Sequence, residues 1–306
     1  MEVSGTVASA RAGDRRAVAR LLTAVENRAP EGPEIAAATK GGDAVIVGVT
    51  GSPGVGKSTL VSALIGAWRA QGRRVAVLAV DPSSPFSGGA LLGDRVRMAD
   101  HALDRDVYIR SVATRGHLGG LAAGTGAAVR LLEGLGFDAV IVETVGVGQA
   151  EVEIAGLADT TLLLLAPGMG DAIQAVKAGV VEIADLYVVN KADRPGADAA
   201  VRDIRAMMSL VRRGPGEWRQ PIVKTVAHQG EGLDELVAGI AKHREWLAGS
   251  DRLAARRRDR AAAEIRAVVE TELRRRYEVT DELAEHVAAG EIDVAEAART
   301  VLENGA

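Results

Sequence analysis

Apolar residues in the middle of the chain fall into short continuous runs that alternate with helical patterns, from Asp43 to about residue 248. Strands buried on both faces read as continuous apolar runs, whereas half-exposed strands alternate apolar and polar residues. The pattern therefore predicts an α/β fold with a mainly parallel sheet covered by helices on both faces. The six predicted strands are residues 45–49, 75–80, 139–142, 161–165, 186–189 and 222–226.

Helical patterns without strands flank this region. Residues 14–28 predict an amphipathic helix with Asp14 as its N-cap, and residues 29–34 break it. Residues 251–278 predict one long helix, in which apolar side chains recur every four residues at Ile265, Val269, Leu273 and Tyr277. We expect three parts: a helical arm (1–42), an α/β domain (43–248) and a second helical arm (249–306).

The role of the second arm stays open between three alternatives. We favour a dimerisation arm, because the helix continues beyond the predicted sheet. The other two are docking on its own domain and nucleic-acid binding by its Arg-rich runs. Those runs are interleaved with acids and lack aromatic residues, which disfavours nucleic acid.

Composition narrows the class of protein. The 306 residues are 47% hydrophobic and only 3% aromatic, with a net charge of −4, so we expect a packed aliphatic core and no nucleic-acid partner. Cysteine is absent, which excludes disulfides and thiolate metal sites, and the five scattered histidines lack ligand spacing. No signal peptide or membrane span is recognisable, so we expect a cytoplasmic protein without membrane attachment.

The strongest chemical signal is a glycine-rich turn between the first predicted strand and the following helix. Its sequence fits G-x-x-x-x-G-K-[ST], the phosphate-binding P-loop. Backbone N–H groups and the helix N-terminus would hold phosphates, Lys57 would bridge the β- and γ-phosphates, and the Ser58 hydroxyl would ligate Mg²⁺. The predicted phosphate-binding residues are Gly51, Ser52, Pro53, Gly54, Val55, Gly56, Lys57, Ser58 and Thr59. The fold class thus becomes a three-layer P-loop NTPase with helical N- and C-terminal extensions.

The base is read by a second motif, Asn190-Lys191-Ala192-Asp193, at the end of a predicted strand. A carboxylate there can accept from both N1–H and the N2 amine of guanine, which adenine does not present together. Lys191 can lie along the base plane, and Asn190 can brace the loops. Val226, Ala227 and His228 lie at the end of the last predicted strand, where a backbone N–H can meet guanine O6. The predicted cofactors are GTP/GDP and Mg²⁺.

The third motif, Glu143-Thr144-Val145-Gly146, carries Glu where most GTPases have Asp. Gly146 would sense the γ-phosphate, and Glu143 would orient either the Mg²⁺ shell or a nucleophilic water. Val147 follows Gly146, so no glutamine stands in the usual water-orienting position, and we infer slow intrinsic hydrolysis that a partner accelerates.

Two further acids, Asp81 and Asp94, can supply carboxylates to Mg²⁺. The alternatives are a turn acid before proline for Asp81 and a helix N-cap for Asp94. The predicted catalytic residues are Lys57, Asp81, Asp94 and Glu143, and the predicted metal ligands are Ser58, Asp81, Asp94 and Glu143.

Five blocks in order resemble the MeaB/ArgK-type GTPases, which carry Glu in the third motif: GVTGSPGVGKSTL, VLAVDPSSPFSGGALLGDRVRM, ATRGHLGGLA, ETVGVGQAE and NKAD. The resemblance covers roughly residues 14–280. It implies a GTPase chaperone that gates adenosylcobalamin delivery to an acyl-CoA mutase, usually methylmalonyl-CoA mutase, and protects or reactivates it. It also implies a homodimer and a further switch at residues 166–177. Val226-Ala227-His228 departs from the commoner Ser-Ala-Leu, so side-chain contacts there do not carry over.

The family's older label, an ATP-dependent kinase in lysine/arginine/ornithine transport, is the alternative function. The guanine-reading motif argues against it, because its carboxylate would find no N2 amine in ATP. A mainly structural partner, in which turnover is incidental, is a third possibility. Gly-rich loops such as 115–126 favour a GTPase that changes conformation.

Overall fold

The computed structural model describes most of the chain, and every structural statement below refers to these residues. The described residues are 2–81, 98–101, 103–113, 124–144, 150–168, 183–210, 214 and 216–304. They form two compact units, Met1–Arg258 and Asp259–Ala306, and each is considered by itself.

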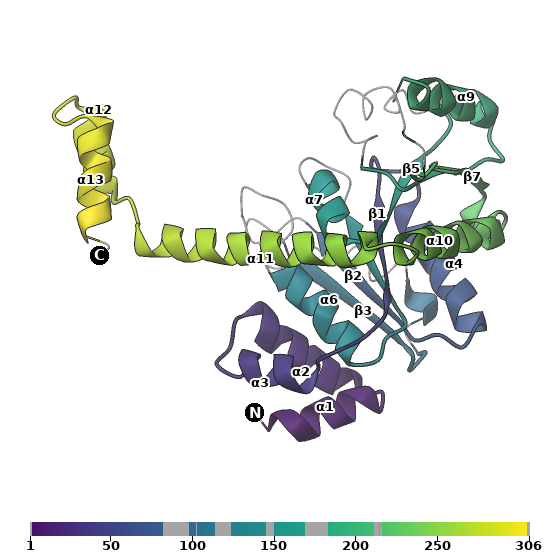
Figure 1. The fold of residues 1–306 in the computed structure, drawn as a ribbon, viewed down its shortest axis with the longest axis horizontal. Coiled ribbons are helices and arrows are strands. Elements are labelled where there is room, and N and C mark those ends of the chain that lie inside the picture. Colours follow the sequence, from purple (N-terminus) through teal and green to yellow (C-terminus); the bar gives the residue numbers. More distant parts are fainter. Residues whose placement is uncertain are drawn as a thin grey trace. The chain divides into compact units, whose positions relative to one another are not determined.

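The first unit is built on a seven-stranded sheet in the order β3-β2-β4-β1-β5-β6-β7 (Figure 1). Every neighbouring pair is parallel, which confirms the predicted α/β class. The strands are β1 (Val45–Thr50), β2 (Val75–Asp81), β3 (Val107–Ala113), β4 (Ala139–Thr144), β5 (Thr160–Leu165), β6 (Leu186–Asn190) and β7 (Ile222–Thr225).

Helices cover both faces of the sheet. The helices of this unit are α1 (Val3–Arg11), α2 (Arg15–Glu26), α3 (Gly32–Ala38), α4 (Lys57–Ala70), α6 (Gly124–Gly134), α7 (Ala150–Leu157), α9 (Ala197–Met208) and α10 (Leu233–Ala248), with the short 3₁₀ helices η1 (Ala99–His101) and η2 (Ala227–Gln229). The long helix α11 (Arg252–Arg276) begins in this unit.

Successive residues of each central strand enter opposite cores, as the period of two in a strand requires. Ile46 of β1 packs in the cluster that contains residues of α1, α2 and α6. Val47 packs in the cluster that contains residues of α4 and α10. A third cluster joins β5 and β6 to α9. All six residues of β1 are buried, which explains why its sequence is a continuous apolar run.

The six predicted strands are all present, but a seventh, β3, is missing from the prediction. Its sequence VYIRSVA places Arg110 and Ser111 inside the run, and among the described strands β3 pairs with β2 alone, at the edge of the sheet. Arg110 has a role there, because its guanidinium donates to Thr23 and Glu26 of α2. An edge strand that holds a covering helix through a charged side chain does not show the apolar pattern of a central one.

The predicted amphipathic helix is α2, and the Asp14 carboxylate accepts from the backbone of Arg16 and Ala17 as its N-cap. Helix α1, which precedes it, was not predicted. Its apolar residues Val3, Val7 and Ala10 are buried, but small polar residues between them weaken the pattern.

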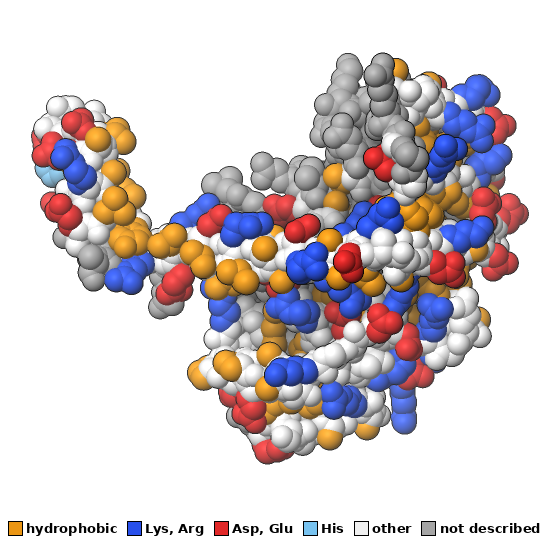
Figure 2. Space-filling view, viewed as in Figure 1, with side chains coloured by type: hydrophobic (Ala, Val, Ile, Leu, Met, Phe, Trp, Pro, Cys, Tyr) orange, Lys and Arg blue, Asp and Glu red, His pale blue; other side chains and the backbone are white. Residues whose placement is uncertain are grey.

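The second unit comprises the rest of α11, with α12 (Asp281–Ala288) and α13 (Val294–Asn304). The predicted long helix is thus confirmed. Its stripe of Ile265, Val268, Val269 and Leu273 is exposed, and Figure 2 shows hydrophobic side chains along this helix. Among the described residues, no helix combines the length and apolar character that crossing a bilayer requires.

Candidate nucleotide-binding site

Four strand ends meet at the carboxyl edge of the sheet, where ligands of open α/β folds bind. The turn after β1 leads into α4, and β4, β6 and β7 end beside it in the order given by the sheet. This edge brings together the described residues of the three predicted motifs.

The turn between β1 and α4 requires glycine at two positions. Gly51 has φ of 144°, and a Cβ atom there would lie 2.3 Å from the Leu164 carbonyl oxygen of β5. Gly56 has φ of 98°, and a Cβ atom would lie 2.5 Å from Asn190 Nδ2. Both values fall in the left-handed region that side chains disfavour. The glycines therefore allow the turn to lie directly against β5 and the end of β6.

Lys57, the first residue of α4, is buried and folds back over this turn. Its Nζ donates to the carbonyl oxygens of Gly51 at 2.7 Å and Ser52 at 3.2 Å. An ammonium held above the N-terminus of a helix is the arrangement that favours a phosphate.

Ser58 and Glu143 meet although they are far apart in sequence. The Ser58 hydroxyl donates to Glu143 Oε1 at 2.8 Å, and Glu143 is only 2% exposed. Hydroxyl and carboxylate oxygens are the hard ligands that Mg²⁺ prefers. The donor set at this point therefore fits a magnesium ion.

Asn190 connects three segments of the site. Its Nδ2 donates to the Val55 carbonyl of the glycine-rich turn at 2.9 Å. Its Oδ1 accepts from the Thr225 hydroxyl at 3.1 Å and from the Ala227 backbone N–H at 3.2 Å. One buried amide thus fixes the end of β6 to the turn and to the segment after β7.

The two charged residues of the same motif are arranged differently. Lys191 has a φ of 57°, and its Nζ donates to the Gly54 carbonyl at 2.6 Å, so its stem runs across the glycine-rich turn. Asp193 is exposed, as is His228, while Val226 and Ala227 are buried. Asp193 is therefore accessible to a ligand.

Several predicted residues fall outside the described part of the chain. Asp94 and Gly146 lie there entirely, and so does most of the predicted switch at residues 166–177. Asp81 is the last residue of β2, but its side chain is not described.

Two features of the site were not predicted from the sequence. Thr225 anchors Asn190, and Thr144 Oγ1 donates to Thr50 Oγ1 at 3.2 Å across the ends of β4 and β1. These threonines sit in apolar runs, where threonine is an ordinary strand residue. Only the placement of β4 beside β1 and of β7 beside β6 distinguishes them.

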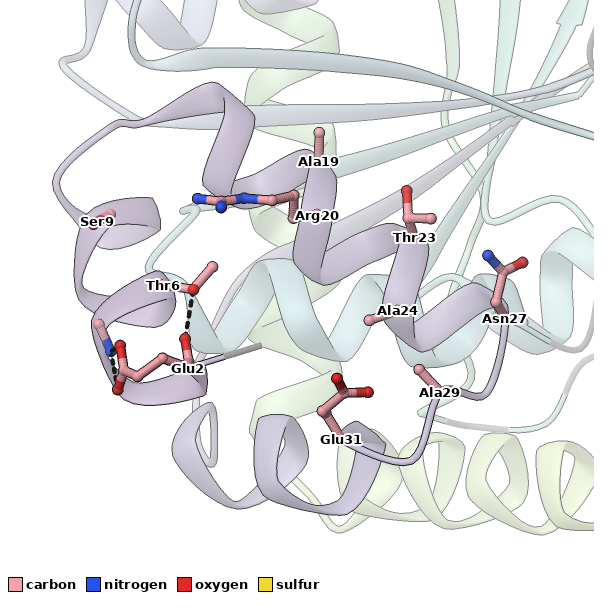
Figure 3. A pocket seen from close by; sticks show the side chains of 11 residues that line it. Glu2, Thr6, Ser9, Ala19, Arg20, Thr23, Ala24, Asn27, Ala29 and Glu31 are labelled. Atoms are coloured by element: carbon pink, nitrogen blue, oxygen red, sulfur yellow. Dashed lines mark hydrogen bonds between the residues drawn. The ribbon is translucent and has the colours of Figure 1, made fainter.

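A separate hollow of about 960 Å³ lies between α1 and α2 (Figure 3). Glu2 on its wall accepts from Gly5 N at 2.9 and 2.7 Å as the cap of α1, and its carbonyl accepts from the Thr6 hydroxyl. None of the motif residues that the structure describes lines this hollow, so we do not assign it to the site.

Comparisons with known proteins agree with the geometry. The sequence profile of the family described as methylmalonyl-CoA mutase-associated GTPase MeaB matches residues 18–282. A relative from Pyrococcus abyssi is 46% identical over 301 residues, which cover 95% of this chain and 93% of the relative. GTPase ArgK of Escherichia coli is 38% identical over 274 residues, covering 86% and 82%. A crystal structure described as LAO/AO transport system kinase superposes with a TM-score of 0.74 at 28% identity, covering 98% and 96%.

Proposed function

This chain belongs to the family of methylmalonyl-CoA mutase-associated GTPases of the MeaB type, and on that premise we propose that it is a GTP-hydrolysing chaperone of an acyl-CoA mutase. In this role it gates the loading of adenosylcobalamin and protects or reactivates the mutase, with methylmalonyl-CoA mutase as the preferred partner. The family description names that enzyme, and the proposal extends it to this chain.

The observation that carries the proposal is the junction at Asn190. Its hydrogen bond to Val55 holds the guanine-reading motif against the phosphate-binding turn, so that one ligand can contact both. A purine nucleotide spans this junction with its phosphates at Lys57 and its base at Asp193. The carboxylate of Asp193 selects guanine, because it accepts from N1–H and the N2 amine together.

Hydrolysis would use the residues around Ser58. When Mg²⁺ is bound it neutralises charge on the phosphates, and Ser58, Glu143, Asp81 and Asp94 are its proposed ligands. Lys57 is proposed to hold the β- and γ-phosphates, and Gly146 to sense the latter. Glu143 lies at hydrogen-bond distance from Ser58, which supports a role at the metal or at the attacking water.

A homodimer is part of the proposal. The helical unit Asp259–Ala306 exposes Ile265, Val269 and Leu273 along one helix, together with Val294 of α13. Exposed apolar stripes of this kind are expected at interfaces.

Steady-state phosphate release with GTP and with ATP tests the proposal, each with and without a purified adenosylcobalamin-dependent acyl-CoA mutase from the same source. We expect slow hydrolysis of GTP only, accelerated several-fold by the mutase. Absence of acceleration, together with absence of a complex in gel filtration, would remove the mutase from the proposal and leave a GTPase.

A kinase linked to lysine/arginine/ornithine transport is the second candidate, since the superposed structure carries the name LAO/AO transport system kinase. The same assay separates the two functions. A kinase would leave ATP intact until an acceptor is added and would then transfer the γ-phosphoryl group to that acceptor, yielding ADP without free phosphate, whereas the proposed chaperone releases phosphate from GTP with water as the acceptor.

A further inference from the structure

The long helix α11 begins with a charge pattern that disfavours a helix start. Its first seven residues, 252–258, read RLAARRR, and we call them the arm base. They contain four arginines and no acid, at the end of the helix where the macrodipole is positive. Arg252 and Arg256 are also four residues apart, where like charges on a helix repel. On its own this segment would fray, so contacts with other segments must stabilise it.

The strongest of these contacts joins Arg256 to Asp185, the residue before β6. Arg256 NH1 donates to Asp185 Oδ2 at 2.9 Å, and NH2 donates to Oδ1 at 2.7 Å, the paired geometry of a strong guanidinium–carboxylate contact. Arg256 NH1 also donates to the Asp159 carbonyl oxygen at 2.7 Å. The Asp185 side chain is only 9% exposed, so salt and water screen this pair less than a surface pair.

Two other arginines of the arm base also have partners in the first unit. Arg252 Cζ lies 4.3 Å from the centroid of the Trp246 ring, within range of a cation–π contact. Arg257 NH2 lies 3.6–3.7 Å from one oxygen of each of three carboxylates, those of Asp43, Glu133 and Asp159. The first unit thus supplies the negative charge that the sequence of the arm base lacks.

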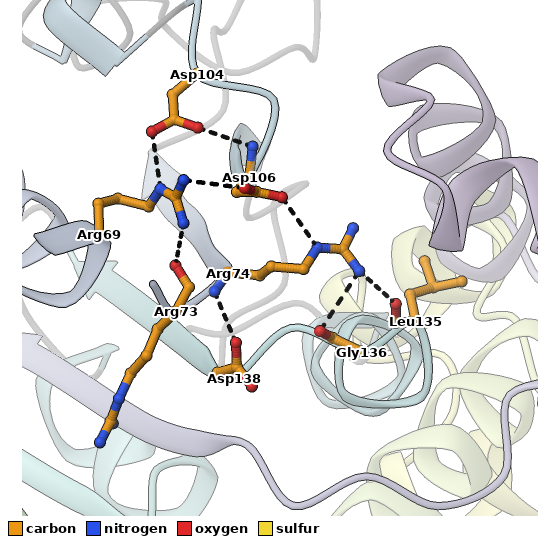
Figure 4. A network of polar contacts seen from close by, with 8 residues as sticks. All are labelled: Arg69, Arg73, Arg74, Asp104, Asp106, Leu135, Gly136 and Asp138. Carbon is orange, nitrogen blue, oxygen red and sulfur yellow. Dashed lines mark hydrogen bonds and ion pairs between the residues drawn. The ribbon is translucent and has the colours of Figure 1, made fainter. Parts of the chain in front are cut away.

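The amino ends of the strands carry a second arginine–aspartate network, whose residues all precede α11 in the chain (Figure 4). Arg69 Nε donates to Asp104 Oδ2 at 2.8 Å, and Arg69 NH2 donates to Asp106 Oδ2 at 3.0 Å. The backbone N–H of Arg74 donates to Asp138 Oδ2 at 2.7 Å. These contacts join α4 to segments that lead into β2, β3 and β4, which pair with one another in the sheet. The arm base belongs to no strand, so its arginine contacts have a larger share in keeping it folded.

We propose that Asp185 and Arg256 form a clamp on which the helical state of the arm base depends. While the pair is intact, the first two turns of α11 are helical and held against the first unit, and when the pair is broken they fray. Docking on its own domain, one alternative for the second arm, therefore applies to the arm base. The exposed stripe from Ile265 to Leu273, later in the same helix, stays available for the proposed homodimer. The inference does not depend on nucleotide binding.

Limited trypsin digestion of the full-length protein tests the clamp, because trypsin cleaves after arginine where a segment is frayed. The reported quantity is the rate of cleavage after Arg257, identified by mass spectrometry. In Arg256→Gln this rate should rise about tenfold, the factor that one hydrogen bond to a charged group supplies. Arg258→Gln is the matched control, since it removes one cation and one cleavage site from the same turn at an exposed position. Its rate should not rise.

Urea below the unfolding transition separates local fraying from global unfolding. Fraying exposes little surface, so the faster cleavage of Arg256→Gln should hardly depend on urea, whereas cleavage through global unfolding rises steeply with it. Asp185→Asn breaks the clamp from the other side and should give the same urea-independent increase. Asp106→Asn weakens the network of Figure 4 and should leave cleavage after Arg257 unchanged.

Three results would overturn the inference. The first is an unchanged cleavage rate in Arg256→Gln, and the second is an equal increase in Arg258→Gln. The third is an increase that grows steeply with urea, or that Asp106→Asn reproduces, because the pair would then stabilise the whole unit and not the arm base in particular. A urea-independent increase confined to Arg256→Gln and Asp185→Asn supports the clamp.

Discussion

The strands of the sheet begin at one side, the amino edge, and end at the other, the carboxyl edge. Different kinds of contact stabilise these two edges. At the amino edge, an aspartate stands one or two residues before five strands: Asp43, Asp106, Asp138, Asp159 and Asp185. Arginine or backbone groups bind them, as in the paired hydrogen bonds of Arg256 to Asp185 at 2.7 and 2.9 Å. At the carboxyl edge the corresponding contacts are those of Lys57, Lys191 and Asn190 with backbone carbonyls.

This difference in contacts shows at which edge the side chains can exchange their partners for a ligand. A cation that donates to carbonyl oxygens can exchange them for a phosphate, whereas a cation paired with a carboxylate cannot do so without leaving a charge unpaired. Strand β6 connects the two kinds of edge over five residues, from Asp185, which precedes it, to Asn190, its last residue. We therefore expect changes at the carboxyl edge to alter ligand binding and changes at the amino edge to alter stability.

Lys57→Ala should have the largest effect. The substitution removes two charge-assisted hydrogen bonds to phosphate, so GTP affinity should fall roughly a thousandfold. Tm without nucleotide should change little, because the Lys57 ammonium donates to backbone carbonyls of the adjacent turn. Fluorescence titration and thermal unfolding measure the two quantities, with the exposed Lys40→Ala as the matched control. A large loss of Tm, or retained GTP turnover, would contradict the assignment.

His243 tests the amino edge through pH. It is fully buried beside Asp185 and Thr160, and burial lowers the pKa of His243 from 6.5 to about 4. Between pH 4 and pH 6.5 His243 binds a proton in the unfolded chain but not in the folded one. The free energy of unfolding therefore rises with pH over this range and is highest above pH 6.5. That contribution, roughly 3 kcal/mol, is lost as pH falls toward 4.

The measurement is urea unfolding at pH 7.0, 5.5 and 4.5 on wild type and His243→Gln. The variant lacks the titrating group but can still hydrogen-bond Thr160, so its stability should fall less over this range. GTP affinity at pH 7 should be unchanged. Equal pH dependence in both proteins would show that other groups dominate.

Asp193→Asn tests base selection at the carboxyl edge. The amide cannot accept from both N1–H and the N2 amine, so GTP affinity should fall about a hundredfold with little change in Tm. Xanthosine triphosphate, which carries a carbonyl at C2, should gain affinity. Calorimetric titration checks both, and Asp198→Asn, an exposed aspartate on the first turn of α9, is the control. Unchanged GTP affinity would remove Asp193 from the base site.

Sequence alone was sufficient wherever one segment carries its own pattern. The buried strands, α2 with its Asp14 cap, and the turn from Gly51 to Ser58 all follow from neighbouring residues. Prediction from the sequence failed where a residue's role depends on a partner that is distant in the sequence. Strand β3 carries Arg110 for α2, and Thr225 gains its role only because β7 lies beside β6. Such roles arise from strand order, which local propensity does not encode.

The smallest predicted effect compares one threonine at each edge. Thr144 donates to Thr50 at the carboxyl edge, and both are buried, so Thr144→Val should cost about 1 kcal/mol in urea unfolding. Thr50→Val with Thr144→Val should cost less than the sum of the two single changes, since neither then leaves a partner unsatisfied. At the amino edge, Thr160→Val leaves the buried Nδ1 of His243 without its partner and should cost more than Thr144→Val. The reverse order would mean that stability is not concentrated at the amino edge.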